Sequence, residues 1–248
     1  MRFYCPAPLY TGAKMVLSDE KYHHAKHVLR LADGGDCIAF NGDSGEFKAI
    51  LHYHKKQAIL NIGGNISPPL DKNSFITTWL FCPLFKRDKM GFIIEKAAEL
   101  GVDNIQPIHM SQVNAAKGRD NFQAEKLTAR AISASEQCER LDILTIHPPI
   151  DIKKIHNLIT DEWCLLTAIE RKDSPAMNEI LKGVFEKTSK KNIAFLFGPE
   201  GGFAGDDVNY LQGIKQNHFC TLGPRILRSE TAALYGLSVI ACCRDGGP

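Results

Sequence analysis

Two glycine- and proline-rich loops contain the residues most able to build a chemical site. In FLFGPEGGFAGDD, residues 195–207, an extended apolar run ends abruptly in GPEGG at 198–202. In TLGPRILRSETAAL, residues 221–234, a predicted strand passes through Gly-Pro into a helix that Ser229 could cap. Glycine lets a ligand approach the bare backbone. The loops therefore predict two walls of one pocket, whose free N–H and C=O groups bind a flat heterocycle.

The spacing of these glycines excludes the common phosphate-binding motifs. No Gly-Lys-Ser/Thr follows, so the first loop is not a P-loop, and its glycines are spaced G-x-x-G-G-x-x-G rather than G-x-G-x-x-G. A glycine-rich turn by itself is often only a tight connection, so the prediction rests on the pair of loops. No metal site is predicted either, because the eight cysteines form no C-x-x-C pair and the histidines lack ligand-like spacing.

The first 70 residues read as a small β domain. Short extended runs alternate with turn signals such as ADGGD and NGDSG, and SDEKYHHAKHVLRL is a helical stretch with Ser18 as a plausible N-cap. We expect strands at 15–17, 37–41, 46–54 and 58–66. This pattern predicts a small barrel with one helix, followed by the linker ISPPLDKNS at 66–74.

From residue 75 the chain alternates between strands and helices. We expect extended runs at 75–81, 105–109, 143–147, 164–169, 193–197 and 218–222. Between them, MGFIIEKAAELG ends on the C-cap candidate Gly101. In FQAEKLTARAISASEQCER, Leu127, Ala131, Ala134 and Cys138 share one face. The alternation predicts an α/β domain with a mostly parallel sheet. Ligands of such sheets bind beyond the carboxyl ends of the strands, where both loops lie.

Composition is that of an ordinary soluble globular protein. Of the 248 residues, 44% are hydrophobic and 23% charged, and the net charge of +2 does not announce a nucleic-acid binder. The N-terminus lacks the apolar core of a signal peptide, and the longest apolar run, 232–243, is too short to span a bilayer. We expect a cytoplasmic protein without membrane contact, whose cysteines are mostly buried thiols.

Beyond the two loops, nearly the whole chain resembles one family. FLFGPEGGF and LGPRILRSETAAL resemble the RsmE family of RNA methyltransferases, in the SPOUT superfamily, and HHAKHVLRLADGGD, IIEKAAELGVDNIQPI and ASEQCER are similar to its other motifs. The resemblance implies methyl transfer from S-adenosylmethionine to N3 of one uridine in 16S ribosomal RNA of the small subunit. It also implies a PUA-like RNA-binding barrel at 1–70, a SPOUT domain with a trefoil knot at 74–248, and a homodimer.

The resemblance assigns roles to residues of the two loops. The adenosyl group would lie against bare backbone, with Thr167, at the end of another predicted strand, on a third wall. The implied cofactor-binding residues are Thr167, Leu196, Gly198, Pro199, Gly201, Gly202, Leu222, Gly223, Ile226 and Leu227.

The acceptor chemistry suggests two catalytic residues. Uridine N3 must lose its imide proton, which spreads negative charge over two ring carbonyls that a cation would stabilise. Arg228, at the end of the second loop, is the candidate cation, and Glu200 is the candidate proton acceptor. Structural readings stand beside these roles: Glu200 could accept backbone hydrogen bonds that shape its loop, and Arg228 could pair with Glu230 or Glu200.

The candidate RNA contacts are His24, Arg30, Lys86, Gln137 and Arg140. The histidine and Arg30 belong to a mildly basic N-terminal surface, while the ASEQCER motif brings Gln137 and Arg140 near the pocket. Lys86, Arg87 and Lys89 could bind phosphates. Each has a structural alternative. His24 could be a surface histidine whose hydrogen bonds are satisfied, and Gln137 and Arg140 could cap and solvate a helix end. The cluster of Lys86, Arg87 and Lys89 could be a solvated basic face. One departure from the family pattern is visible: residues 113–115 are Val-Asn-Ala where similar proteins carry Glu-Arg-Ser, so an arginine is missing.

Two other classes of function are weighed against the methyltransferase. A non-catalytic RNA-binding or ribosome-assembly factor on the same fold would have no use for both glycine loops. A nucleotide-dependent oxidoreductase would carry G-x-G-x-x-G near the first strand of its sheet, where FCPLFKRD has no glycine. The helix expected at 229–243 is apolar on nearly every side, which predicts burial on all sides and, with it, a two-fold partner facing Leu237.

Overall fold

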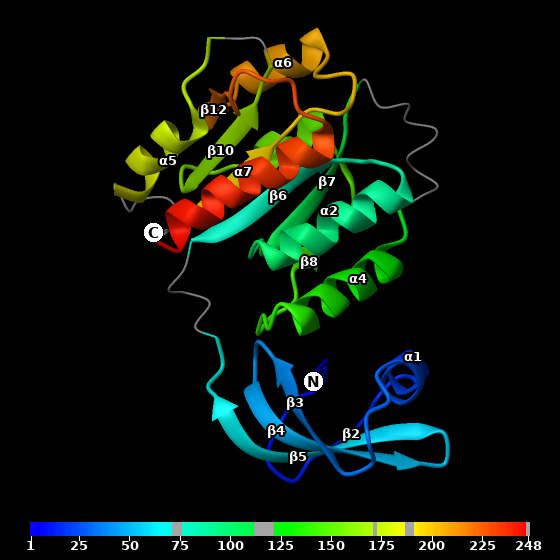
Figure 1. Ribbon diagram of the computed structural model, residues 1–248. Helices are drawn as coiled ribbons and strands as arrows, with labels where there is room; N and C mark the ends of the chain where they lie inside the picture. Colours follow the sequence, from blue (N-terminus) through cyan, green and yellow to red (C-terminus); the bar gives the residue numbers. More distant parts are fainter. Residues whose placement is uncertain (71–75, 112–121, 171–172, 187–190, 247–248) are drawn as a thin grey trace. The chain divides into compact units, whose positions relative to one another are not determined.

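The computed structural model describes residues 1–70, 76–111, 122–170, 173–186 and 191–246 (Figure 1). The chain forms two compact units. Met1–Asn73 and Ser135–Ile143 make up the first, and Ser74–Ala134 and Leu144–Pro248 the second. The division into domains 1–70 and 74–248 stays a prediction, to which the structure adds that Ser135–Ile143 groups with the first unit.

The first unit is built on a curled sheet. Its strands lie in the order β1 (Arg2–Tyr4), β3 (Gly35–Asn41), β4 (Gly45–His54), β5 (Gln57–Ser67) and β2 (Lys14–Val16). Pairing is antiparallel except between β1 and β3, and β1 was not foreseen from the sequence. Alternate side chains of β4 and β5 fill the core together with Phe3 and Leu9. The sheet confirms the expected β domain.

One helix of the first unit follows the prediction only in part. The hydroxyl of Ser18 accepts a hydrogen bond from the Lys21 amide at 3.3 Å, which confirms the N-cap of α1 (Asp19–His23). The chain then widens into a π-helical segment, η1 (His24–Val28), in which only Ala25 is buried. A π-helical segment of five residues is too short to produce a period of its own in the sequence.

The segment Ser135–Ile143 is held in the first unit by polar contacts. The Glu136 carboxylate accepts from the Tyr4 amide at 2.8 Å and from Lys21 Nζ at 2.5 Å. The guanidinium of Arg2 pairs with Glu46 and also donates to the Arg140 carbonyl at 3.4 Å. A segment distant in the sequence thus completes the first unit.

The second unit contains a parallel sheet. Its strands follow the order β12 (Asn217–Cys220), β10 (Trp163–Ala168), β11 (Asn192–Leu196), β6 (Thr77–Pro83), β7 (Asn104–His109) and β8 (Thr145–Ile146), and β9 (Ile150–Asp151) also pairs with β7. Every pairing in it is parallel. This confirms the predicted α/β class, and it brings the carboxyl ends of β10, β11 and β12 to one edge.

Helices flank this sheet. They are α2 (Arg87–Glu99), α4 (Ala124–Gln137), α5 (Met177–Glu186), α6 (Gly205–Gln212) and α7 (Ser229–Arg244), with a short 3-10 helix, η2 (Ile152–Asn157). Helix α7 crosses the sheet between α5 and α2 (Figure 1). Gly101 follows α2 with φ +75°, as expected of a glycine that ends a helix. Leu127, Ala131 and Ala134 form the buried face of α4.

Helix α7 corrects two expectations. Its N-cap is Arg228, without a side-chain hydrogen bond, and Ser229 is the first helical residue. The helix is not buried all round either. Leu237 is 1% exposed and packs within the unit, while an exposed face carries Thr231, Tyr235, Ser238 and Cys242. The number of apolar residues in α7 led to the wrong expectation. The exposed residues are spaced along one face of the helix, and three of them have small side chains that do not mark an evident polar face in the sequence.

Most of the cysteines are buried, as expected from the sequence. Cys5, Cys37, Cys82, Cys164 and Cys220 are buried free thiols, whereas Cys242 is exposed. Burial raises the pKa of Cys5 and of Cys37 to about 11, which keeps both as unreactive thiols at neutral pH. In the described part of the chain, no helix combines the length and the apolar character needed to cross a bilayer.

Candidate active site

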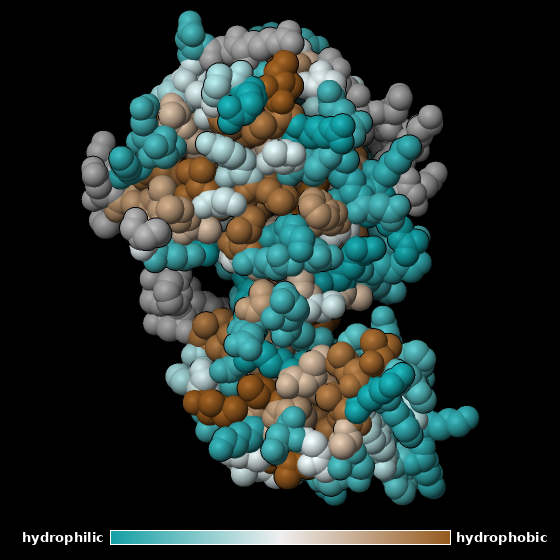
Figure 2. Space-filling view, in the orientation of Figure 1, coloured by the Kyte–Doolittle hydropathy of each residue, from teal (hydrophilic) through white to brown (hydrophobic). Residues whose placement is uncertain are grey.

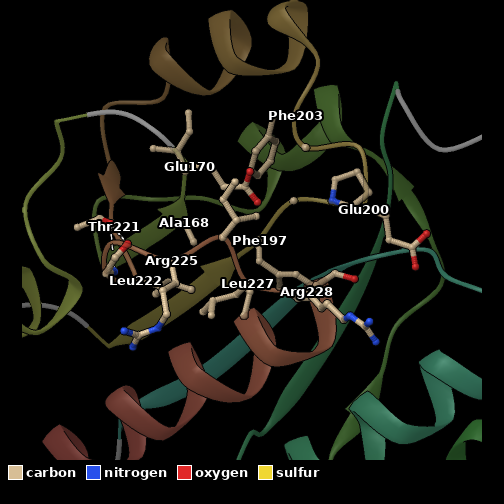
Figure 3. A pocket seen from close by; sticks show the side chains of 18 of the residues that line it. Ala168, Glu170, Phe197, Glu200, Phe203, Thr221, Leu222, Arg225, Leu227 and Arg228 are labelled. Carbon is tan, nitrogen blue, oxygen red and sulfur yellow. Dashed lines mark hydrogen bonds between the residues drawn. The ribbon is translucent and has the colours of Figure 1, made fainter.

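A cavity of about 1420 Å³ lies at the carboxyl edge of the parallel sheet. Three loops surround it: the segment after β10, the GPEGG loop after β11 and the Gly-Pro loop after β12 (Figure 3). Parallel strands place the ends of all three at the same edge. Both sequence-predicted loops therefore face one cavity. Its predicted members are Gly198, Pro199, Glu200, Gly201, Gly202, Leu222, Gly223, Ile226, Leu227 and Arg228.

The first loop turns tightly after β11. The amide of Gly202 donates to the Pro199 carbonyl at 2.9 Å, and Gly202 has φ +73°, a conformation that favours glycine. A Cβ added at Gly202 would meet no atom within 4 Å, so open space lies beside the backbone there. At Gly198 a Cβ would come 3.3 Å from the Phe203 ring, which folds back over the loop.

The second loop has the same character. Gly223 has φ +105° and, like Gly202, no neighbour within 4 Å of an added Cβ. The Thr221 hydroxyl lies 3.2 Å from both the amide and the carbonyl of Gly223 and fixes the turn. Thr221 also donates its amide to the Pro175 carbonyl at 3.0 Å, which ties this loop to the one after β10.

Two predicted cofactor residues lie behind the cavity wall. Thr167 and Leu196 are completely buried within β10 and β11, and the Thr167 hydroxyl donates to Asn217 Oδ1 at 2.6 Å. Their successors, Ala168 and Phe197, line the cavity instead. The offset of one residue follows from strand geometry, since consecutive side chains point to opposite faces.

A cluster of ion pairs lies at one side of the cavity, and its cation is Lys89 of α2. Its ammonium lies 2.5 Å from Glu200 Oε1 and 2.8 Å from Glu230 Oε2. Hydrogen bonding to Lys89, the largest influence, lowers the pKa of Glu230. Arg228 is exposed and forms no ion pair with any described residue. The ion pair with Glu200 or Glu230 that was considered for Arg228 is therefore formed by Lys89 instead.

Other lining residues were not singled out from the sequence. Glu170 and Asp173 follow β10, Phe203 closes over the first loop, and Arg225 extends from the second loop away from Arg228 (Figure 3). The apolar part of the lining consists of Phe197, Phe203, Leu222, Ile226 and Leu227. Proximity to the two glycine loops was the available signal for Arg225 and Phe203. Glu170 and Asp173 had no such signal, because only the parallel sheet brings their loop alongside.

The lining suits S-adenosylmethionine. Bare backbone at Gly202 and Gly223 borders open space, so a flat ring can approach it closely. Leucine, isoleucine and phenylalanine side chains offer an apolar contact for an adenine, and the carboxylates of Glu170 and Asp173 offer charge complementary to an ammonium or sulfonium group.

The predicted RNA contacts lie in both units. His24, Arg30 and Gln137 are exposed in the first unit, and Arg30 has φ +53° just after η1. Arg140, also in the first unit, is held by Asp142 through its Nε at 2.7 Å. Lys86 is exposed at the N-cap of α2 in the second unit. The departure at residues 113–115 lies outside the described residues. The preceding Ser111 donates its hydroxyl to the buried Asp207 at 2.7 Å.

Two family models match separate segments of the chain. The model described as "RNA methyltransferase domain" matches residues 72–241, and the one described as "RNA methyltransferase PUA domain" matches residues 17–63. Curated relatives extend over almost the same length. The chain is 31% identical to ribosomal RNA small subunit methyltransferase E of Rickettsia conorii, over 96% of this chain and 94% of that protein. The corresponding protein of Bacillus subtilis is 26% identical, over 91% and 88%.

Solved structures agree with these matches. A putative methyltransferase of Legionella pneumophila, in complex with S-adenosylmethionine, has a TM-score of 0.82 and 28% identity, covering 99% of this chain and 97% of the other. The ribosomal RNA small subunit methyltransferase E of Neisseria gonorrhoeae, also bound to S-adenosylmethionine, has a TM-score of 0.76 and 27% identity, with coverage of 96% and 95%. With both of its glycine loops on one cavity and matches along nearly its whole length, the chain belongs to the RsmE family of ribosomal RNA small subunit methyltransferases.

Proposed function

We propose that this chain is an S-adenosylmethionine-dependent methyltransferase that acts on N3 of one uridine in 16S ribosomal RNA. The observation that carries the activity is the cavity between two glycine loops at the carboxyl edge of the parallel sheet. Relatives of matching length are named as small-subunit ribosomal RNA methyltransferases, and two related structures hold the cofactor. The choice of uridine and of N3 extends the family resemblance and is the part that the experiment below must test.

The residues of the cavity have distinct tasks in this proposal. S-adenosylmethionine, when bound, supplies an activated methyl group on a sulfonium. The loops at 198–202 and 221–228 hold it against bare backbone and orient it, which suffices for much of the acceleration of an in-line transfer. Arg228, exposed at the cavity and unpaired among the described residues, stabilises negative charge on the uridine carbonyls. Glu200 takes up the N3 proton, and its side chain, 75% exposed, passes that proton to water.

We further propose that the protein is a cytoplasmic homodimer and that its sheet is knotted, as the family resemblance implies. The exposed face of α7, with Thr231, Tyr235, Ser238 and Cys242, is the surface offered to the partner. Figure 2 shows apolar residues gathered over this side of the second unit. Leu237 has no part in that surface, since it is buried within its own unit.

Calorimetry and product analysis test the proposal together. The purified protein should bind S-adenosylmethionine and S-adenosylhomocysteine, and it should not bind NADH or ATP. With 16S ribosomal RNA that lacks the modification, it should release one equivalent of 3-methyluridine on nuclease digestion. Absence of cofactor binding would refute the methyltransferase. Methylation at another atom or another base would leave the activity standing and refute the choice of N3.

A further inference from the structure

Lys89 is the centre of a charge cluster that joins three parts of the cavity. Its ammonium contacts Glu200 on the first loop at 2.5 Å, Glu230 in the first turn of α7 at 2.8 Å, and the Ser229 hydroxyl at 3.1 Å. The lysine itself belongs to the first turn of α2. One side chain therefore connects α2, the GPEGG loop and the start of α7, which follows the second loop directly.

The surroundings of Lys89 keep it charged and in place. Only 22% of its side chain is exposed, and its ammonium lies 5.0 Å from the centre of the Phe85 ring. Partial burial opposes the charged form, but the hydrogen bonds to Glu200 and Glu230 outweigh it and raise the pKa of Lys89. The residue is thus a poor proton acceptor at neutral pH.

Its hydrogen-bonding capacity is also fully used. An ammonium has three N–H donors, and three acceptors surround this one. A phosphate of RNA would have to displace one of them. The phosphate-binding reading of Lys89 therefore conflicts with the contacts of the folded chain, whereas a bridging role uses every one of them.

We infer that Lys89 is a positioning residue that holds the two glycine loops at the separation needed to bind the cofactor. This inference rests on the proposed function for the identity of the cofactor. The two carboxylates that it bridges belong to different segments of the cavity lining, the GPEGG loop and the first turn of α7, and would repel each other without it. Glu200 exposes 75% of its side chain and Glu230 only 26%, so the bond to Glu200 is the more easily broken. When the bond to Glu200 breaks, the GPEGG loop is free to move, while Lys89 remains paired with Glu230 of α7.

Binding of S-adenosylhomocysteine by calorimetry tests this inference, because that ligand lacks the sulfonium charge and responds little to a changed field in the cavity. Lys89→Met should weaken binding about tenfold, equivalent to about 1.4 kcal/mol, and Lys89→Arg should restore part of it. The matched control is Lys96→Met on the same helix. Lys96 also lies between two glutamates, Glu95 and Glu99, but outside the cavity lining, and its loss should leave affinity within twofold.

A double-mutant cycle separates a charge bridge from a purely structural role. Glu230→Gln alone breaks one ion pair and should weaken binding about twofold to threefold, as expected of a partly exposed pair. In the Lys89→Met background the same change removes repulsion, so it should strengthen binding. A loss of similar size in both backgrounds would overturn the inference, as would normal binding by Lys89→Met.

Hydrogen exchange without cofactor gives a second measurement that does not depend on the proposed function. Backbone amides of residues 197–204 should exchange faster in Lys89→Met than in the wild type or in Lys96→Met. Unchanged exchange would overturn the inference. If the wild type binds no S-adenosylhomocysteine although this exchange behaves as expected, the proposed function fails and the bridge between the loops remains.

Discussion

Arg228 and Glu200 were proposed together as catalytic residues, and the structure places them in different electrostatic settings. Glu200 shares the Lys89 ammonium with Glu230, whereas Arg228 has no ion-pair partner among the described residues. A guanidinium that is not neutralised by a neighbour can act on charge that develops in the substrate. At the scale of single residues, Arg228 is therefore the stronger candidate of the two.

Replacing Arg228 tests that role. Arg228→Ala should lower kcat by about 100-fold, the usual effect of losing one group that stabilises an oxyanion, with cofactor affinity within about twofold of wild type. Arg225→Ala is the matched control on the same loop, since Arg225 extends in another direction (Figure 3), and it should change kcat by less than about threefold. Single-turnover methylation measures the difference. Equal losses in the two variants would contradict a specific role for Arg228.

Gly223 offers a test of the bare-backbone contact. A side chain at φ +105° strains the backbone, by about 1–2 kcal/mol for left-handed conformations, and it would project into space open to a ligand. Gly223→Ala should weaken cofactor binding at least tenfold in calorimetry. Gly64→Ala, where an added Cβ also meets no atom within 4 Å, should leave binding unchanged. Wild-type affinity in Gly223→Ala would show that the cofactor does not use this wall.

The burial of His147, which lies outside the cavity lining, predicts that the stability of the protein depends on pH. The imidazole ring stacks on Trp79 at 4.9 Å, and Nε2 lies 2.9 Å from Asn104 Oδ1. Burial lowers the pKa of His147 below the ordinary 6.5, so the folded protein holds this proton less tightly than the unfolded chain. The free energy of unfolding should therefore fall as pH drops below 6.5 and level off beneath the lowered pKa. Urea titrations should show a shallower fall in His147→Gln.

At the scale of elements, the contact between α7 and β11 depends on one glycine. A Cβ at Gly236 would come 2.3 Å from the ring of Phe195, which is completely buried. This close approach allows α7 to lie flat on the sheet, which directs its first turn toward Lys89. The position of one cavity wall therefore depends on core packing between α7 and β11, in which no catalytic group takes part.

Gly236→Ala should destabilise the protein by about 1–3 kcal/mol, the usual cost of overpacking a core. Gly183→Ala is the control, because it also lies inside a helix, α5, but an added Cβ there meets no atom within 4 Å. That variant should be stabilised by about 0.5–1 kcal/mol, since alanine favours helix. Urea unfolding compares them, and a neutral Gly236→Ala would contradict the close packing of α7.

At the scale of the whole molecule, the proposed dimer depends on the exposed face of α7. Tyr235, 46% exposed, is the largest side chain of that face. Tyr235→Glu should shift the protein to monomer in sedimentation at micromolar concentration, because a carboxylate buried in an interface is costly. Ile50→Glu, at a 43% exposed position of the first unit, is the control and should remain dimeric. A wild type that sediments as an active monomer would refute the dimer itself.

Local patterns in the sequence determined much of the fold and part of the site. Apolar runs and turn signals located the main strands to within about two residues, since burial of one face requires periodicity. The glycines at 198–202 and 223 identified the two loops, because tight turns and close approach of a ligand require residues without a side chain. Short elements escaped prediction. Strand β1 is three residues long and β9 is two, too short to show a period.

Only the tertiary structure decided which side chains meet. Lys89 pairs with Glu200 and Ser229, which are 111 and 140 positions away. Glu136 contacts Tyr4 and Lys21, which precede it by 132 and 115 positions. Likewise, the exposed face of α7 follows from which neighbours cover it and not from its composition. The physical reason is common to these cases. Periodicity and turn chemistry are local properties of the chain, whereas charge pairing and burial depend on residues that folding brings together.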